Sequence, residues 1–225
     1  MHTDFWLERW EQNQIGFHEQ EINGHLQKFW GNLDIPANSK IFVPLCGKSR
    51  DILWLLSLGY QVVGVEISPL AVQSFFSENQ LEATITDCGV FQCWESEGLS
   101  IYVGNFFDLS HEQLRDCLAV YDRAALIALP PEMREEYVRH LMKITPELRH
   151  SLLVTLQYTQ HEMPGPPFSV DESEVHSLFA KTYAIEPLST EDILQKHDNF
   201  KERGLSNLIE KVYRLSKSPD EMSGS

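Results

Sequence analysis

The sequence predicts an α/β protein with a mostly parallel, twisted sheet, helices on both faces of the sheet and an antiparallel strand at the C-terminal end. Three observations carry this prediction. Apolar strand-like runs alternate with helix-like segments, no linker or internal repeat divides the chain, and residues 40–66 read as one strand–loop–helix–strand unit. Such alternation is typical of parallel sheets joined by right-handed crossovers. With 225 residues the chain can bury a sizeable core, so we expect a single domain over residues 1–225.

The N-terminal segment is expected to be helical. Residues 4–14 should form a short helix on which Trp6 and Trp10, four positions apart, share one face. After a break, an amphipathic helix is expected over residues 22–30. We expect residues 1–38 together to form a helical lid over the functional site.

The stretch 40–66 is the most informative, because it describes half of a nucleotide-binding unit that ends at Glu66. Ligands of open parallel sheets bind at the carboxyl ends of the strands, so this stretch predicts where the site lies. Its parts follow in the order strand (41–43), loop (44–48), helix (49–58, capped by Ser49 and stopped by Gly59) and strand (62–65).

The loop favours a ribose-containing ligand without phosphates. The distance along the chain from Leu45 to Glu66 is close to the roughly 20 positions that separate a glycine loop from a ribose-binding acid. However, Gly47 is the single glycine where a dinucleotide fingerprint has three, and Pro44 removes a backbone donor that a pyrophosphate needs. S-adenosylmethionine is therefore the leading candidate, and a nicotinamide-dependent enzyme is disfavoured. The spacing alone leaves open an ordinary βαβ unit whose acid faces solvent.

The rest of the chain continues the alternation of strands and helices. The final two strands should pair as an antiparallel addition, because the segment between them has no long helical pattern. In order, the expected elements are a helix (68–79), extended pieces (84–87 and 92–94), strands (99–103 and 120–129), a helix (132–144), a strand (151–158), a proline-rich loop (161–168), a helix (171–181, capped by Asp171 or Ser169), two strands (183–188 and 208–215) and a disordered polar tail (217–225).

Composition excludes several partners. The formal net charge of −15 disfavours nucleic acid and anionic membrane surfaces. The N-terminus has no signal-peptide pattern, and no apolar run approaches the roughly 18 residues of a membrane helix, so a cytoplasmic location is expected. The four cysteines show no C-x-x-C pair or zinc spacing, which predicts neither disulfides nor a metal site. Cys46 is read as a small packed residue in preference to a nucleophile, and nothing calls for more than a monomer.

Seven segments together resemble a thiopurine S-methyltransferase of bacterial type, over roughly residues 5–215. They are the two-tryptophan helix, Gly16-Phe17-His18, PLCGKS (44–49), VVGVEIS (62–68), FDL (107–109), YDRAAL (121–126) and PGPPF (164–168). The resemblance implies a Rossmann-like class I methyltransferase fold and S-adenosylmethionine as cofactor. It also implies methylation of thiopurines and other aromatic or heterocyclic thiols at sulfur, with release of S-adenosylhomocysteine. Some bacterial members of this family are linked to methylation of selenium and tellurium species.

The resemblance also implies cofactor-binding residues. The backbone of Leu45 would contact the methionine part, and Glu66 would accept hydrogen bonds from the ribose hydroxyls. Asn105 and Phe106 match the family's adenine-side segment. An aromatic lid over the cofactor would come from Trp10, with Trp6 as the second choice, since an indole face attracts a sulfonium cation.

Three further residues are implied on the acceptor side. Arg123 would lie at the cofactor, facing either its carboxylate or the incoming substrate; the alternative is an Asp122–Arg123 pair that only solvates the end of a strand. Phe17 would stack on the heterocycle, or else be a core aromatic. Arg203 resembles an arginine near the substrate, although the spacing around it departs from that of relatives.

The expected chemistry needs no obligatory base. Aromatic thiols ionise near neutral pH, so a thiolate can attack the sulfonium methyl in line, and positioning supplies most of the rate. Arg123 or Arg203 would favour the anionic substrate, while His18 and His161 are read as structural. The alternatives are a methyltransferase for another acceptor (selenium or tellurium species, or an oxygen or nitrogen nucleophile) and a non-catalytic S-adenosylmethionine-binding module.

Overall fold

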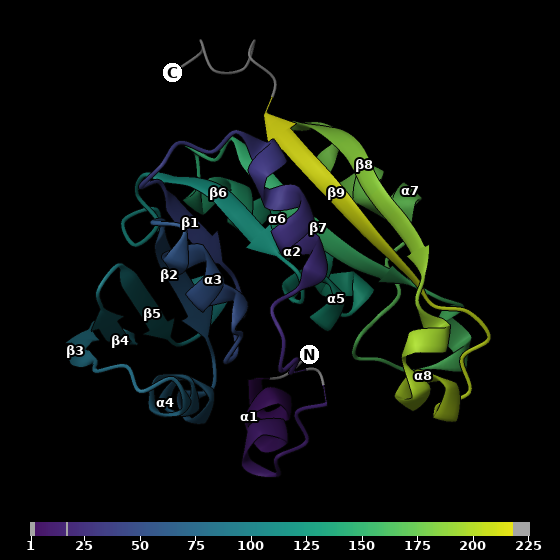
Figure 1. The fold of residues 1–225 in the computed structure, drawn as a ribbon, viewed down its shortest axis with the longest axis horizontal. Helices are drawn as coiled ribbons and strands as arrows, with labels where there is room; N and C mark the ends of the chain where they lie inside the picture. Colours follow the sequence, from purple (N-terminus) through teal and green to yellow (C-terminus); the bar gives the residue numbers. More distant parts are fainter. Residues whose placement is uncertain (1–2, 17, 218–225) are drawn as a thin grey trace.

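A computed structural model describes residues 3–16 and 18–217 and contains one nine-stranded sheet in the order β3-β4-β5-β2-β1-β6-β7-β9-β8 (Figure 1). The five strands from β5 to β7 are parallel, and β9 and β8 extend the sheet antiparallel at one edge, as the sequence predicts. The strands are β1 (Lys40–Val43), β2 (Gln61–Glu66), β3 (Thr84–Cys88), β4 (Phe91–Ser96), β5 (Leu99–Val103), β6 (Cys117–Asp122), β7 (His150–Gln157), β8 (Tyr183–Asp192) and β9 (Ile209–Lys217).

The two faces of the sheet carry separate apolar cores, which confirms the prediction of helices on both sides. In β1, Phe42 points into the core under α5, α6 and α7, whereas Ile41 and Val43 point into the core under α2, α3 and α4. This alternation follows from the two-residue period of a strand. The helices are α1 (Thr3–Glu11), α2 (Gly24–Phe29), α3 (Asp51–Ser57), α4 (Pro69–Glu78), α5 (Ala125–Ala128), α6 (Pro131–Ile144), α7 (Glu172–Phe179) and α8 (Asp198–Glu202).

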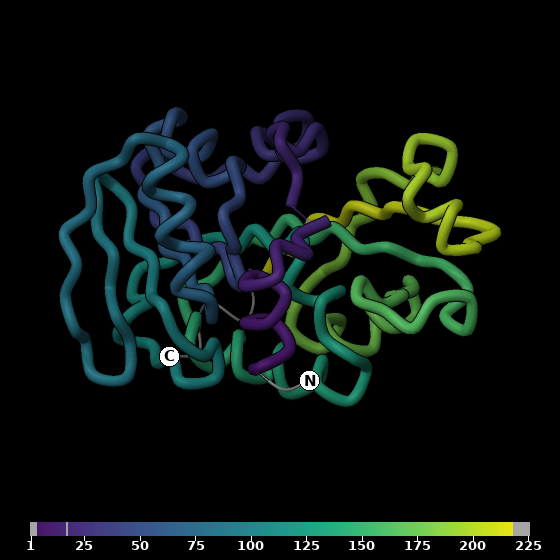
Figure 2. Tube along the Cα trace, turned by 90° about the horizontal axis from the view of Figure 1, so that it is seen from below, coloured from purple at the N-terminus to yellow at the C-terminus, as the bar shows by residue number. Residues whose placement is uncertain are grey.

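The N-terminal segment divides into two parts. Helix α1 lies beside α4, and Figure 2 shows it crossing the middle of the molecule, between the β3–β4 hairpin at one end and α8 at the other. Helix α2 and the short 3-10 turn Trp30–Leu33 instead pack on the sheet, with Leu26 and Trp30 buried. Of the expected lid over residues 1–38, α1 is therefore the part that is not built into the core.

One expected strand is wrong after its first three residues. The predicted strand over residues 120–129 ends at Asp122, and the chain then turns into α5. Asp122 causes the turn, because its Oδ1 accepts hydrogen bonds from the backbone N–H groups of Ala125 (3.1 Å) and Leu126 (3.2 Å). Arg123 consequently follows the strand and does not lie within it.

Smaller differences concern the ends of elements. Helix α3 begins at Asp51, two residues after the expected cap, and Ser49 Oγ accepts from the Asp51 amide at 3.2 Å. Ser68 caps α4, and Asp171, one of the two caps expected for the next long helix after α6, caps α7. The antiparallel pairing of β3 with β4 and of β4 with β5 was not expected, since short extended pieces do not reveal their partners. The expected tail after Lys217 lies outside the described residues.

Candidate functional site

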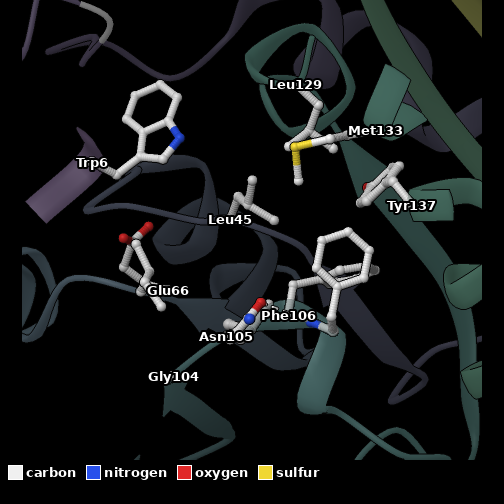
Figure 3. A pocket seen from close by; sticks show the side chains of 12 residues that line it. Trp6, Leu45, Glu66, Gly104, Asn105, Phe106, Leu129, Met133 and Tyr137 are labelled. Carbon is white, nitrogen blue, oxygen red and sulfur yellow. Dashed lines mark hydrogen bonds between the residues drawn. The ribbon is translucent and has the colours of Figure 1, made fainter. Parts of the chain in front are cut away.

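A cleft opens where β2 and β5 end and where the chain leaves β1 (Figure 3). It holds about 540 Å³ of space that no atom fills, and part of this space is open to solvent. Glu66 and Trp6 lie on one side, and Leu129, Met133 and Tyr137 lie on the other, with Leu45 between them. The lining is Trp6, Leu45, Val65, Glu66, Ile67, Gly104, Asn105, Phe106, Phe107, Leu129, Met133 and Tyr137.

The loop after β1 folds back over the end of β2. Leu45 and Gly47 both have positive φ (47° and 53°), a conformation that turns the chain sharply but is unusual for leucine. Two backbone bonds hold the turn: Cys46 N–H to the carbonyl of Val65 (3.0 Å) and Gly47 N–H to Glu66 Oε2 (2.8 Å). Cys46 itself is buried against Gly64 and burial raises the pKa of its thiol. The loop therefore presents Leu45 to the cleft and keeps Cys46 away from it.

Among the described residues, Glu66 is the one carboxylate that lines the cleft, and it is only 6% exposed. Its Oε2 accepts from Gly47 N–H and its Oε1 from Ser68 N–H (2.9 Å). Burial raises the pKa of Glu66, while these amides oppose the rise. Because a carboxylate offers about four acceptor positions, it keeps capacity for two further donors.

The segment after β5 forms the floor of the cleft. Asn105 Oδ1 accepts from Phe107 N–H (3.1 Å) and so begins the 3-10 turn Phe106–Asp108. The ring of Phe106 stacks on Phe42 with centroids 6.4 Å apart and is tilted against Tyr137 at 4.8 Å. The sequence-predicted residues Asn105 and Phe106 thus meet Leu45 and Glu66 in one cleft.

The opposite wall was not predicted from the sequence. Tyr137 donates its hydroxyl to Asp122 Oδ2 (2.7 Å), and burial raises the pKa of Asp122 to about 6. Arg134 donates Nε–H to the carbonyl of Leu129 (2.9 Å) and forms an ion pair with Glu174. The signal that indicates this wall is the apolar face of α6, whose start is marked by Pro130-Pro131.

The two tryptophans of α1 take different places. Trp6 lines the cleft, whereas Trp10 is 6% exposed and packs against Gly47, with its Cζ2 3.4 Å from where a β-carbon on that glycine would lie. Trp10 therefore contacts the loop that carries Leu45, and Trp6 faces the open space.

Arg123 lies near two acids but does not pair with Asp122, whose oxygens are used by Tyr137 and by α5. Its Nη1 is 3.9 Å from Asp51 Oδ2, and its Nη2 is 4.0 Å from Glu19 Oε1. It is not among the residues that line the cleft. Nearby, burial and the cations Lys48 and Arg123 lower the pKa of His18.

The other acceptor-side residues are not brought to the cleft. Arg203 is exposed at the end of α8, with its guanidinium 5.8 Å from the centroid of the Phe200 ring, and His161 is also exposed. Phe17 lies outside the described residues. The PGPPF loop is held by Phe168 N–H, which donates to the carbonyl of Ile127 at 2.7 Å. Within residues 3–16 and 18–217, no three His, Cys, Asp or Glu side chains gather as a metal site would require.

Comparison with known proteins identifies close relatives. The family described as thiopurine S-methyltransferase matches residues 1–218. The thiopurine S-methyltransferase of Pseudomonas fluorescens (strain Pf0-1) is 47% identical over 215 residues, which are 96% of this chain and 99% of that protein. The enzyme of the same name from Nitrosospira multiformis is 45% identical, over 96% of this chain and 98% of its own.

Solved structures show the same fold at much lower identity. An S-adenosylmethionine-dependent methyltransferase from Anabaena variabilis has a TM-score of 0.63 at 12% identity, covering 96% of this chain and 95% of its own. The 1,6-didemethyltoxoflavin-N1-methyltransferase of Burkholderia thailandensis, solved with S-adenosylhomocysteine, has a TM-score of 0.60 at 13% identity, covering 96% and 87%. The fold is thus the Rossmann-like class I methyltransferase fold that the resemblance implies.

Proposed function

The chain belongs to the thiopurine S-methyltransferase family, and on that premise we propose that it transfers the methyl group of S-adenosylmethionine to the sulfur of thiopurines and other aromatic or heterocyclic thiols, releasing S-adenosylhomocysteine. The structural observation that carries the proposal is the meeting of Leu45, Glu66 and Asn105 around one cleft at the strand ends. These three residues lie at the carboxyl ends of β1, β2 and β5, which are neighbouring parallel strands of the sheet.

The residues of the cleft fit this cofactor. Glu66 keeps acceptor capacity for the two ribose hydroxyls after binding two amides. Phe106 and the neighbouring Asn105 offer an apolar face and an amide for the adenine, and Leu45 borders the space for the amino-acid part. The single-glycine loop suits a ligand without pyrophosphate. When bound, S-adenosylmethionine supplies an electrophilic methyl group on a positively charged sulfur.

The protein's own contribution is positioning and exclusion of water. Leu129, Met133 and Tyr137 form an apolar wall that limits solvent around the reacting atoms. Trp6 can close the opposite side and offers its ring face to a cation. Holding two reactants in line in such a site supplies a large part of a rate enhancement.

A sulfur acceptor suits this cleft better than an oxygen or nitrogen acceptor. The described lining residues include no histidine or lysine, and the one carboxylate, Glu66, is engaged by backbone amides. An alcohol or amine acceptor needs a proton acceptor close to the methyl group. An aromatic thiol ionises on its own and is intrinsically nucleophilic. Arg123 and Arg203 are proposed to favour the anionic acceptor as it approaches.

We also propose a cytoplasmic monomer that acts on small molecules and does not bind nucleic acid. The net charge of −15 supports the last point, since such a surface repels a phosphate backbone. Among the described residues, no helix is both long and apolar enough to cross a membrane.

The test is an assay for S-adenosylhomocysteine release with a panel of acceptors: a thiopurine, a thiophenol, a phenol and an aromatic amine of matched size. Turnover with the two thiols and not with the phenol or amine is expected. Binding of S-adenosylmethionine measured by calorimetry separates failure of the cofactor assignment from failure of the acceptor assignment. Normal cofactor binding without thiol turnover would overturn the proposed acceptor.

A further inference from the structure

Two cysteines lie on the same face of the β3–β4 hairpin. Cys88 ends β3 directly opposite Phe91, and Cys93 of β4 lies opposite Thr86. Because side chains alternate between faces, Thr86, Cys88, Phe91 and Cys93 share one face, with the two cysteines on a diagonal. The turn between the strands is short, and Gly89 takes the positive φ (69°) that it requires.

The two cysteines are neighbours on the hairpin but differ in exposure. Cys93 lies between Thr86 of β3 and Tyr102 of β5, each directly opposite it in the sheet. Cys88 is exposed, whereas Cys93 is 2% exposed beneath it. Burial, with Glu95 nearby, raises the pKa of Cys93 to about 12, so this thiol keeps its proton. Thr86 Oγ1 lies 3.6 Å from Cys88 Sγ, so this hydroxyl can donate a hydrogen bond to the exposed sulfur.

This hairpin face is connected to the wall of the cleft. The ring of Phe91 lies so close to Gly104 that a β-carbon there would be 2.4 Å from it. Gly104 lines the cleft and donates its N–H to the carbonyl of Glu66 at 2.9 Å. Phe91 therefore packs against the backbone that connects the end of β5 with the backbone of Glu66.

We propose that Cys88 and Cys93 are a redox-sensitive pair, and that their oxidation to a disulfide displaces Phe91 and weakens cofactor binding. Cβ atoms on a strand diagonal lie farther apart than the roughly 3.8 Å of a disulfide, so bridging must pull the two strands together around Phe91. The effect passes from Phe91 to Gly104 and on to Glu66. Because tightly packed side chains such as Phe91 transmit small shifts, we expect the bridge to lower the affinity for S-adenosylmethionine about tenfold.

The oxidant is a peroxide. The Cys88 thiolate attacks one peroxide oxygen, the O–O bond breaks, and Cys88 becomes a sulfenic acid while hydroxide leaves. The sulfur of Cys93 then attacks the sulfenic sulfur, the S–S bond forms and the S–O bond breaks. Water leaves with the proton of Cys93. Two thiols lose two electrons and two protons, and the peroxide is reduced to two waters.

The experiment treats the full-length protein with hydrogen peroxide, counts free thiols, maps disulfides by mass spectrometry and measures the Kd for S-adenosylmethionine by calorimetry. We expect loss of two thiols, a Cys88–Cys93 peptide and a Kd raised about tenfold, all reversed by dithiothreitol. Cys88→Ser should lose no thiol pair and keep its affinity. Cys117→Ser, a buried cysteine on β6, should behave like the wild type.

The inference rests on the assignment of the cleft to S-adenosylmethionine, but the thiol count does not. If the reduced protein fails to bind the cofactor, the proposed function fails. The thiol count and the disulfide map still show whether Cys88 and Cys93 form a bridge. Retention of all thiols, a disulfide between two molecules through Cys88, over-oxidation of Cys88 without a bridge, or a bridge that leaves the Kd unchanged would each overturn the proposal.

Discussion

The strand-end side and the loop side of the proposed site are built differently. On the strand-end side, Glu66 ends β2 and Asn105 follows β5, and both side chains are fixed by hydrogen bonds from backbone amides. On the loop side, Arg203 is exposed at the end of a five-residue helix and only approaches a phenylalanine ring. The sheet therefore positions Glu66 and Asn105 without help from a ligand. The loops, in contrast, do not bring Arg203 to the cleft.

This difference indicates that one side binds the cofactor and the other side admits the acceptor. A pre-formed half holds a large, constant cofactor at low entropic cost, because its groups are already ordered. An acceptor half made of loops can admit thiols of several shapes, since adaptable surfaces tolerate varied ligands. We expect changes on the strand-end side to alter cofactor affinity strongly, and changes on the loop side to alter acceptor kinetics weakly.

Glu66→Gln should give the largest effect. The amide would place a donor against the N–H of Gly47 or Ser68, and it would lose acceptor capacity for the ribose. We expect the Kd for S-adenosylmethionine to rise about 100-fold, or ~2.8 kcal/mol, measured by calorimetry. Glu78→Gln, which removes an exposed partner of Lys48, is the matched control and should bind normally. Equal affinities in the two variants would remove Glu66 from the site.

Gly104→Ala should destabilise the same half. A methyl group there would lie 2.4 Å from the buried Phe91 ring, which must move to admit it. Overpacking of this kind lowers the free energy of unfolding by about 2 kcal/mol. Urea denaturation is the measurement, and Gly31→Ala, where a β-carbon meets nothing within 4 Å, is the control. If both variants were equally stable, the strand-end wall would be less tightly packed than its distances imply.

The sequence predicted the strand-end half because local pattern and topology agree there. The apolar run before Glu66 and the loop at Leu45 locate both residues at the same edge of any parallel sheet. The wall from Leu129 to Tyr137 was missed because its position depends on Asp122. The carboxylate of Asp122 ends the strand and starts a helix within an apolar run, and strand propensity alone does not predict this turn. The β3–β4 hairpin was missed because strand partners depend on contacts far apart in the chain.

Asp122→Asn tests how strongly burial raises the pKa of this capping acid. Burial raises its pKa from 3.8 to about 6, so the folded state binds its proton more readily than the unfolded state. Its contribution to stability is therefore full below pH 4 and is lost as the pH rises through about 6. The asparagine variant lacks this titration. Between pH 5.5 and 7.5, the wild type should lose roughly 1 kcal/mol of unfolding free energy relative to the variant.

Chemical denaturation of both proteins at the two pH values gives this difference. Parallel pH curves would show that Asp122 keeps an ordinary pKa in the fold, and that its bonds to Tyr137 and α5 fully offset its burial.

Arg203→Ala should give the smallest effect and is the direct test of the loop side. An exposed guanidinium attracts an anionic thiol only weakly, because solvent and salt screen it. We expect KM for a thiopurine to rise about threefold at low salt, with kcat and the Kd for S-adenosylmethionine unchanged. Arg115→Ala removes another exposed cation, from the loop before β6, and should leave all three quantities as they are. A fall in cofactor affinity, or an unchanged KM, would place Arg203 outside the acceptor half. A tenfold or larger rise in KM would mean that α8 closes on the acceptor, and that the loop side is ordered by its ligand.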